Sequence, residues 1–270
     1  MKVQRIRMIY FSATDTTKTV VRRIGGQLAQ VWGLSVQEDD FTLPAARETD
    51  IVCGADELAV VGVPVYAGRV PNKLLPYVRD HIKGNETPVV AVVLFGNRDY
   101  DDALIELRDV LGANGFCAIA GAAFVGEHSF SNTLAAGRPD AEDLQLADSF
   151  AQDIAKKLDA MEQLPTQPVT VKGNTPLKPY YTPPHAREYL KVKPVLNDNC
   201  TGCGLCASLC PTGAIDPQDV RQYRGACIKC GACIKKCPQK ARYFDNEIYL
   251  SHKRALEENF TRRAQVELFL

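Results

Sequence analysis

Eight of the ten cysteines in this 270-residue chain lie between Cys200 and Cys237 and form the same pattern twice. The pattern is C-x2-C-x2-C-x3-C-P, which runs from Cys200 to Pro211 and again from Cys227 to Pro238. Thiols gathered in this way form either disulfides or bonds to soft metals. Because the first residues lack the apolar stretch and small-residue cleavage site of an export signal, we expect metal ligation.

The two runs resemble those of bacterial two-cluster ferredoxins, and the resemblance covers residues 195–250. It implies two [4Fe-4S] clusters, because two residues between ligands let the backbone wrap one face of a cubane. The proline after each fourth cysteine turns the chain away, so this cysteine serves the other cluster. The ligand sets implied are Cys200, Cys203, Cys206 and Cys237 for one cluster, and Cys227, Cys230, Cys233 and Cys210 for the other.

Two four-cysteine zinc sites are the alternative, and they would hold the fold without redox chemistry. Zinc ribbons pair C-x2-C knuckles across a longer spacer, whereas here cysteine triplets recur with a trailing C-P. The pattern therefore favours iron–sulfur clusters, whose reduction potentials span about −700 to +450 mV. Nearby lysines either tune these potentials, dock an acidic partner or form a solvated face; they are Lys229, Lys235, Lys236 and Lys240.

A second group of polar side chains follows the first apolar run of the chain and leads directly into a helical pattern. Backbone N–H groups at a helix N-terminus, together with hydroxyl groups, can bind a phosphate. A plain helix cap is the alternative, since serine and threonine are common at that position. The residues of this loop are Ser12, Thr14, Asp15, Thr16 and Thr17.

Positioning these side chains requires a scaffold, and residues 1–160 alternate short apolar runs with amphipathic helical segments. Residues 89–95 are apolar on both faces, as a fully covered central strand must be. The alternation predicts a doubly wound α/β domain with five parallel strands, whose ligands gather at the carboxyl ends of the strands. The expected strands are 6–11, 34–41, 58–63, 88–95 and 116–125, and the expected helices are 17–31, 71–82, 101–113 and 139–158.

This part of the chain resembles the flavodoxins, because its first loop is similar to their T/S-x-T-G-x-T signature at Ser12, Thr14 and Thr17. Asp15 stands where that family has glycine. Aspartate tolerates a left-handed backbone, but its carboxylate would repel a phosphate. The resemblance implies a five-stranded parallel sheet of order 2-1-3-4-5 and FMN with its phosphate in this loop.

Two further loops at the same sheet edge carry aromatic residues. By resemblance, Tyr66 and Tyr100 stack on the flavin ring, and the Ala67–Gly68 peptide flips near flavin N5. Exposed turn tyrosines without a ligand are the alternative. The residues expected to contact the cofactor from these loops are Tyr66, Ala67, Gly68, Gly96, Asn97 and Tyr100.

His128 lies in the loop after the fifth expected strand, again at the carboxyl edge. Imidazole titrates near neutral pH, so His128 is a candidate catalytic acid toward a flavin or a small substrate. A histidine that only hydrogen-bonds its own loop is the alternative. No G-x-G-x-x-G follows an expected strand, so the usual nicotinamide motif is not visible.

Charge and proline content divide the chain. Residues 1–160 carry 16 basic and 22 acidic side chains, whereas residues 161–270 carry 16 and 10. Seven of the sixteen prolines fall between positions 165 and 194, which predicts an extended, semi-rigid connection. We expect four parts: a flavodoxin-like domain at 1–162, a proline-rich linker at 163–194, an α+β two-cluster ferredoxin domain at 195–250 and a tail at 251–270 that either docks on the first domain or frays.

The chain as a whole resembles the flavodoxin–ferredoxin fusion family, which implies electron transfer between two [4Fe-4S] clusters and FMN. The alternatives are a flavin-dependent reductase of a small substrate, fed through the clusters, and a redox-responsive binding protein, so whether the chain is an enzyme stays open. Because 32 basic residues balance 32 acidic ones, nothing indicates bulk attraction to nucleic acid or an anionic membrane. We expect a cytoplasmic protein with a redox partner protein, and a homodimer is a further option.

Overall fold

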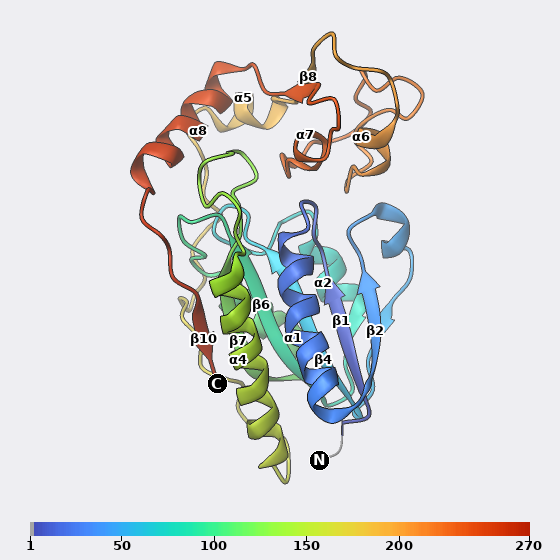
Figure 1. Ribbon diagram of the computed structural model, residues 1–270, viewed down its shortest axis with the longest axis vertical. Coiled ribbons are helices and arrows are strands. Elements are labelled where there is room, and N and C mark those ends of the chain that lie inside the picture. Colours follow the sequence, from blue (N-terminus) through green and yellow to red (C-terminus); the bar gives the residue numbers. More distant parts are fainter. Residues whose placement is uncertain (1–2) are drawn as a thin grey trace.

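The longest apolar runs of the sequence form a six-stranded sheet in the computed structural model, which describes residues 3–270 (Figure 1). The first two residues of the expected domain 1–162 lie outside the described residues. All nine residues of β6 are buried, because parallel strands inside a sheet are covered on both faces. The strands of this sheet are β1 (Arg5–Tyr10), β2 (Ser35–Asp40), β4 (Glu57–Pro64), β6 (Thr87–Phe95), β7 (Phe116–Val125) and β10 (Glu267–Phe269).

The strand order is β10-β7-β6-β4-β1-β2, and the five strands from β2 to β7 pair in parallel. Counted among these five strands alone, the order is the expected 2-1-3-4-5, so the predicted flavodoxin-like fold class is confirmed. The sixth strand, β10, is antiparallel and was not expected. Parallel pairing brings the carboxyl ends of five strands to one edge, where their loops gather.

Helices cover both faces of the sheet (Figure 1). One face is covered by α1 (Thr16–Trp32) and α4 (Ala141–Asp159), whose apolar side chains share a core with it. The other is covered by α2 (Leu75–His81) and α3 (Ala103–Ala113). Among residues 3–270, no helix has both the length and the apolar character needed to cross a membrane. The smaller elements of this part are a 3-10 helix, η1 (Pro44–Arg47), and the paired strands β3 (Ile51–Val52) and β5 (Ile82–Lys83).

The proline-rich connection packs against this sheet unit. Val169 donates its N–H to the carbonyl of Ala118 in β7 at 2.8 Å, and the side chains of Val169 and Val171 are buried. The segment also contains a short helix, α5 (Ala186–Lys191), which its proline content did not predict. Contacts with the sheet unit therefore add to the stiffness that prolines supply.

The cysteine-rich module lies above the carboxyl edge of the sheet and repeats itself in structure (Figure 1). Leu196 pairs with Arg242 in a short antiparallel ladder. When Cys200 is aligned with Cys227, the bridge between Ile215 and Tyr223 joins the same two positions of the repeat. The elements of this module are β8 (Val195–Leu196), α6 (Leu205–Ser208), α7 (Ala232–Lys235) and β9 (Arg242–Tyr243).

The C-terminal tail returns from the cysteine module to the sheet. It begins with α8 (Glu247–Asn259) and ends in β10, which pairs with β7. Asn97 holds the stretch between them: its side-chain amide donates to the carbonyls of Phe260 and Arg262 at 2.6 Å each and accepts from the N–H of Ala264 at 3.2 Å. The tail thus docks on the edge of the first domain.

Candidate functional site

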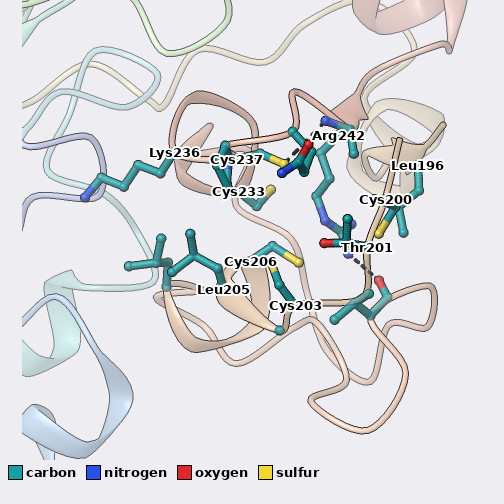
Figure 2. A pocket seen from close by; sticks show the side chains of 16 residues that line it. Leu196, Cys200, Thr201, Cys203, Leu205, Cys206, Cys233, Lys236, Cys237 and Arg242 are labelled. Carbon is teal, nitrogen blue, oxygen red and sulfur yellow. Dashed lines mark hydrogen bonds between the residues drawn. The ribbon is translucent and has the colours of Figure 1, made fainter. Parts of the chain in front are cut away.

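Five cysteines line a cavity beside α6, which we call the α6 cavity (Figure 2). Three come from the first cysteine run and its helix, and two come from the second run. The cavity measures about 390 Å³, open solvent included. Its cysteines are Cys200, Cys203, Cys206, Cys233 and Cys237.

A second cavity of about 380 Å³, the α7 cavity, has the complementary composition. Three of its cysteines come from the second run, and Cys210 comes from the end of the first. Each cavity therefore combines cysteines of both repeats, and Cys233 lines both cavities. The cysteines of the α7 cavity are Cys210, Cys227, Cys230 and Cys233.

Backbone N–H groups point at the crossing cysteines in both cavities. Ala214 donates to the Cys210 sulfur at 3.2 Å, and Ala241 donates to the Cys237 sulfur at 3.3 Å. The two bonds occupy equivalent positions of the repeat. Because N–H donors stabilise negative charge on sulfur, they would raise the reduction potential of a cluster held there.

The cysteine thiols suit a multinuclear group. All ten cysteines are free of disulfide bonds. Burial raises the pKa of the Cys230 thiol to about 12, so a thiolate at this position needs the positive charge of bound metal. Within residues 3–270, no three His, Cys, Asp or Glu side chains meet closely enough to hold a single metal ion. The four cysteines of each set instead surround a larger space.

A third cavity, of about 450 Å³ with open solvent included, lies at the carboxyl ends of β1, β4, β6 and β7. We call it the threonine cavity. The expected residues that line it are Thr14, Thr16, Thr17, Tyr66, Gly96 and His128.

The threonines stand at the N-terminus of α1, where the backbone N–H groups of the first turn favour an anion. Ser12 does not line the threonine cavity. Its buried hydroxyl instead accepts from the N–H of Lys18 at 3.0 Å and fixes the loop. Thr14, Thr16 and Thr17 are therefore the hydroxyl groups available to a phosphate.

Asp15 takes the left-handed backbone conformation that the sequence analysis allowed it, with φ 68°. Its carboxylate pairs with Lys236, which follows α7 in the cysteine module, with Nζ 2.9 Å from Oδ1. The lysine balances the negative charge that would repel a phosphate in this loop. The departure from the flavodoxin signature is thus compensated by a residue 221 positions away.

Tyr66 connects the threonine cavity to the cysteine module. Burial raises its pKa well above the ordinary value, and the charges of Cys230 and Cys227 raise it further. Its side chain packs against the apolar core that contains Cys230 and Ala232, two residues that line the α7 cavity. Ala67 and Gly68 form the tip of a tight turn, both at positive φ, and they do not line the threonine cavity. The Ala67 carbonyl accepts from the N–H of Tyr181 at 3.0 Å, so the linker holds the peptide that was expected to flip.

Two expected cofactor residues lie elsewhere. Tyr100 is fully buried, packs against Phe95 and donates its hydroxyl proton to Glu267 at 2.7 Å, so it presents no face to a flavin. The side-chain amide of Asn97 forms its hydrogen bonds with the C-terminal tail. Only Gly96 of this loop reaches the threonine cavity, where it packs against His128. Both side chains form hydrogen bonds with the returning tail, whose path the sequence left open.

His128 lines the threonine cavity as a neutral imidazole. Burial lowers its pKa to about 4, and the positive charges of His252 and Lys235 add to the effect. Its Nδ1 accepts from the N–H of Phe130 at 3.1 Å, which leaves Nε2 as the protonated nitrogen. His128 can therefore donate a hydrogen bond into the cavity, but it does not carry the extra proton of an acid at neutral pH.

The junction between the module and the sheet was not visible in the sequence. Gly231 lies so close to the loop after β7 that an added Cβ would stand 2.6 Å from the Ser129 carbonyl oxygen. Beside it, Lys235 pairs with Glu127 and donates to the Ser131 carbonyl at 2.7 Å. The lysines before Cys237 were a sign of this junction in the sequence, but only the fold brings their acidic partners near.

Comparison with known proteins supports the two-part organisation. Residues 185–242 match the family model of the 4Fe-4S dicluster domain, which supports two [4Fe-4S] clusters. No curated protein matches the chain. A flavodoxin-like domain that precedes a 4Fe-4S dicluster domain is consistent with a flavodoxin–ferredoxin fusion.

Solved structures with similarity to the chain include three flavodoxins. One is a flavodoxin from the domain Archaea, with 15% identity and a TM-score of 0.38, covering 58% of this chain and 99% of its own. Another is a short-chain flavodoxin associated with a non-canonical PDU bacterial microcompartment, with 15% identity, a TM-score of 0.37 and the same coverage. The third is oxidised flavodoxin 2 from Bacillus cereus, with 15% identity, a TM-score of 0.41 and coverage of 57% and 99%.

The Gly231 contact can be tested against an internal control. Gly231→Ala adds a Cβ against Ser129 at φ 77°, whereas Gly204→Ala adds one at the equivalent position, φ 78°, with nothing within 4 Å. Both variants carry the same left-handed strain, so their difference reports the contact. We expect Gly231→Ala to be less stable than Gly204→Ala by about 1–3 kcal/mol.

The measurement is denaturant unfolding of both variants, together with amide hydrogen exchange of residues 126–131. Faster exchange in Gly231→Ala alone would show that the module has moved off the sheet. Equal stability and equal exchange in the two variants would contradict a tight junction at this point.

Proposed function

We propose that the chain is an electron-transfer iron–sulfur flavoprotein that passes electrons between two [4Fe-4S] clusters and FMN. The observation that carries the proposal is the direct contact between the α7 cavity and the threonine cavity. Tyr66 lines the threonine cavity and packs on the core that contains Cys230, while Gly231 of the α7 cavity lies against Ser129 of the threonine cavity. One-electron carriers therefore adjoin a site suited to a cofactor that exchanges one or two electrons.

The cysteine sets fit cubane clusters in number, spacing and surroundings. Each cavity offers at least four thiols, and Cys210 and Cys237 each accept a backbone N–H. When bound, [4Fe-4S] clusters carry single electrons. The chain's own contribution is to hold the thiols around each space, to bury them and to direct N–H groups at the sulfurs.

The threonine cavity fits FMN through its phosphate. The hydroxyl groups of Thr14, Thr16 and Thr17 and the first turn of α1 supply donors, and Lys236 neutralises Asp15 beside them. Tyr66 supplies an aromatic surface in the lining of the same cavity. Tyr100 has no part in the site, so Tyr66 is the aromatic residue that we assign to the flavin ring.

The contacts also indicate the order in which electrons would pass through the two clusters and the flavin. The α7 cavity adjoins the threonine cavity, and its Cys230 is buried in the same core as the sheet. The α6 cavity carries the exposed Cys203. We therefore propose that electrons exchange with a partner protein at the α6 cavity and reach the flavin through the α7 cavity.

A flavin-dependent reductase is the second candidate, because His128 lines the cavity in which a small substrate would meet the flavin. The role that His128 can fill is that of a neutral hydrogen-bond donor, since burial keeps its pKa near 4. Such a donor orients a carbonyl or nitro oxygen, but it transfers no proton readily at neutral pH.

The cofactor content tests the cluster assignment. Protein prepared without oxygen should be brown and contain roughly eight iron and eight sulfide ions per chain, as two cubanes require. Cys203→Ser and Cys230→Ser each remove one ligand, so each should lower the iron content toward half. Cys117→Ser is the matched control, since its thiol only bonds the Pro165 carbonyl. Stoichiometric zinc in a colourless sample would contradict the proposal.

The phosphate loop predicts a preference for FMN over riboflavin. Hydrogen bonds to a charged group contribute about 1.5–3 kcal/mol each, so Thr14→Ala with Thr16→Ala should weaken FMN binding at least 10-fold, and riboflavin binding much less. Flavin fluorescence titration of flavin-depleted protein measures both affinities. Thr19→Ala, an exposed change on the same helix, should leave them unchanged. Equal affinity of the unmodified protein for FMN and riboflavin would argue against a phosphate site.

Single-turnover kinetics separate the two candidate functions. After the clusters are reduced by a one-electron donor, the flavin absorbance should bleach within the same molecule. If the reduced flavin is then reoxidised only when a redox partner protein is added, the carrier function holds. Reoxidation by a small molecule alone, slowed in His128→Ala, would favour the reductase.

A further inference from the structure

Arg242 is a buried cation beside one of the two cysteine cavities. It is 2% exposed and lines the α6 cavity, and Figure 2 shows it among the cysteines there. One terminal nitrogen donates to the Tyr223 hydroxyl at 2.7 Å, and the other donates to the Val220 carbonyl. The Nε atom has no hydrogen-bond partner in the protein, and within residues 3–270 no other buried side-chain nitrogen or oxygen shares this condition.

The charge of Arg242 is directed at the cysteine set of the α6 cavity. Arg242 lines the same cavity as Cys200, Cys206 and Cys237, and a guanidinium is not deprotonated at neutral pH. The guanidinium therefore stays charged although it is buried. A buried cation needs compensating negative charge, which the thiolates of the α6 cavity supply.

The repeat provides an internal comparison. Arg242 is the counterpart of Ile215 in the first half of the repeat, and both pair with an equivalent partner on the opposite strand. Ile215 is also buried and lines the α7 cavity. At this position one cavity thus has an apolar side chain and the other has a positive charge with a free N–H. The buried Lys229 also lines the α7 cavity, but its Nζ donates to the Leu190 carbonyl at 3.3 Å.

We propose that Arg242 directs its Nε–H to the cluster held in the α6 cavity and keeps that cluster at a higher reduction potential than the one in the α7 cavity. Reduction adds one electron to a cluster and no proton, so a nearby cation and an N–H donor stabilise the reduced form. This inference rests on the proposed cluster ligation. Its consequence is that the first electron taken up settles on the cluster farther from the flavin.

The test is an anaerobic redox titration of the holoprotein, followed by electron paramagnetic resonance, with iron and sulfide measured on every sample. The unmodified protein should show two one-electron steps at different potentials. In Arg242→Gln the higher step should shift down toward the lower one. Ile215→Arg should raise the lower step, because it places a guanidinium at the equivalent position of the other cavity. Arg221→Gln, which removes an exposed charge from the same module, should leave both steps in place.

The outcomes separate this inference from the proposed function. Absence of iron in the unmodified protein would overturn both. Full iron with a single step, or with a separation that Arg242→Gln leaves unchanged, would overturn the role of Arg242 alone. If Arg242→Gln loses iron, Arg242→Lys provides a second test, because it keeps the positive charge. Retained iron in Arg242→Lys with a distinct higher step supports the inference. Loss of iron in Arg242→Lys as well assigns Arg242 a structural role and overturns the inference.

Discussion

Helix α7 packs on the carboxyl edge of the sheet, and every functional feature of this protein depends on that contact. The approach is close because the residues at it are small. Gly231 has no side chain to meet the Ser129 carbonyl, and Ala232 is almost completely buried. Cys230 lies in the same core as the strands. A bulkier residue at position 231 would separate the cysteine module from the loops that line the threonine cavity.

Opposite charges of the two halves meet at this junction. The first half of the chain carries an excess of acidic side chains, and the second half carries an excess of basic ones. Lys235 pairs with Glu127 and Lys236 pairs with Asp15, and both lysines are largely withdrawn from solvent. An exposed ion pair such as Lys236–Asp15 contributes little to stability, whereas the partly buried Lys235–Glu127 pair helps to fix the register of the module on the sheet. The pair with Asp15 also removes a charge that would oppose a phosphate.

Two chain segments tie the module to the sheet at its other side. The linker packs Val169 and Val171 on the first domain before it reaches the cysteines. The tail then returns, held by Asn97, and pairs β10 with β7. A module attached by one flexible linker would sample many orientations. Attachment before and after the cysteines restricts it to the orientation in which the α7 cavity faces Tyr66.

The amino-acid sequence determined the features that depend on local spacing and periodicity. Apolar runs predicted the five parallel strands, and β7 has the expected ends at Phe116 and Val125. The cysteine pattern predicted that cysteines of both runs would come together. These features are visible in the sequence because the residues that create them are close neighbours in the chain, or repeat at a fixed interval.

Tertiary structure decided which side chains were left free for a ligand. Tyr100 and Asn97 lie in the expected loop, yet both form hydrogen bonds with the C-terminal tail, which is far away in the sequence. Each side chain can satisfy only a few partners, and which partners are in reach depends on how distant segments pack.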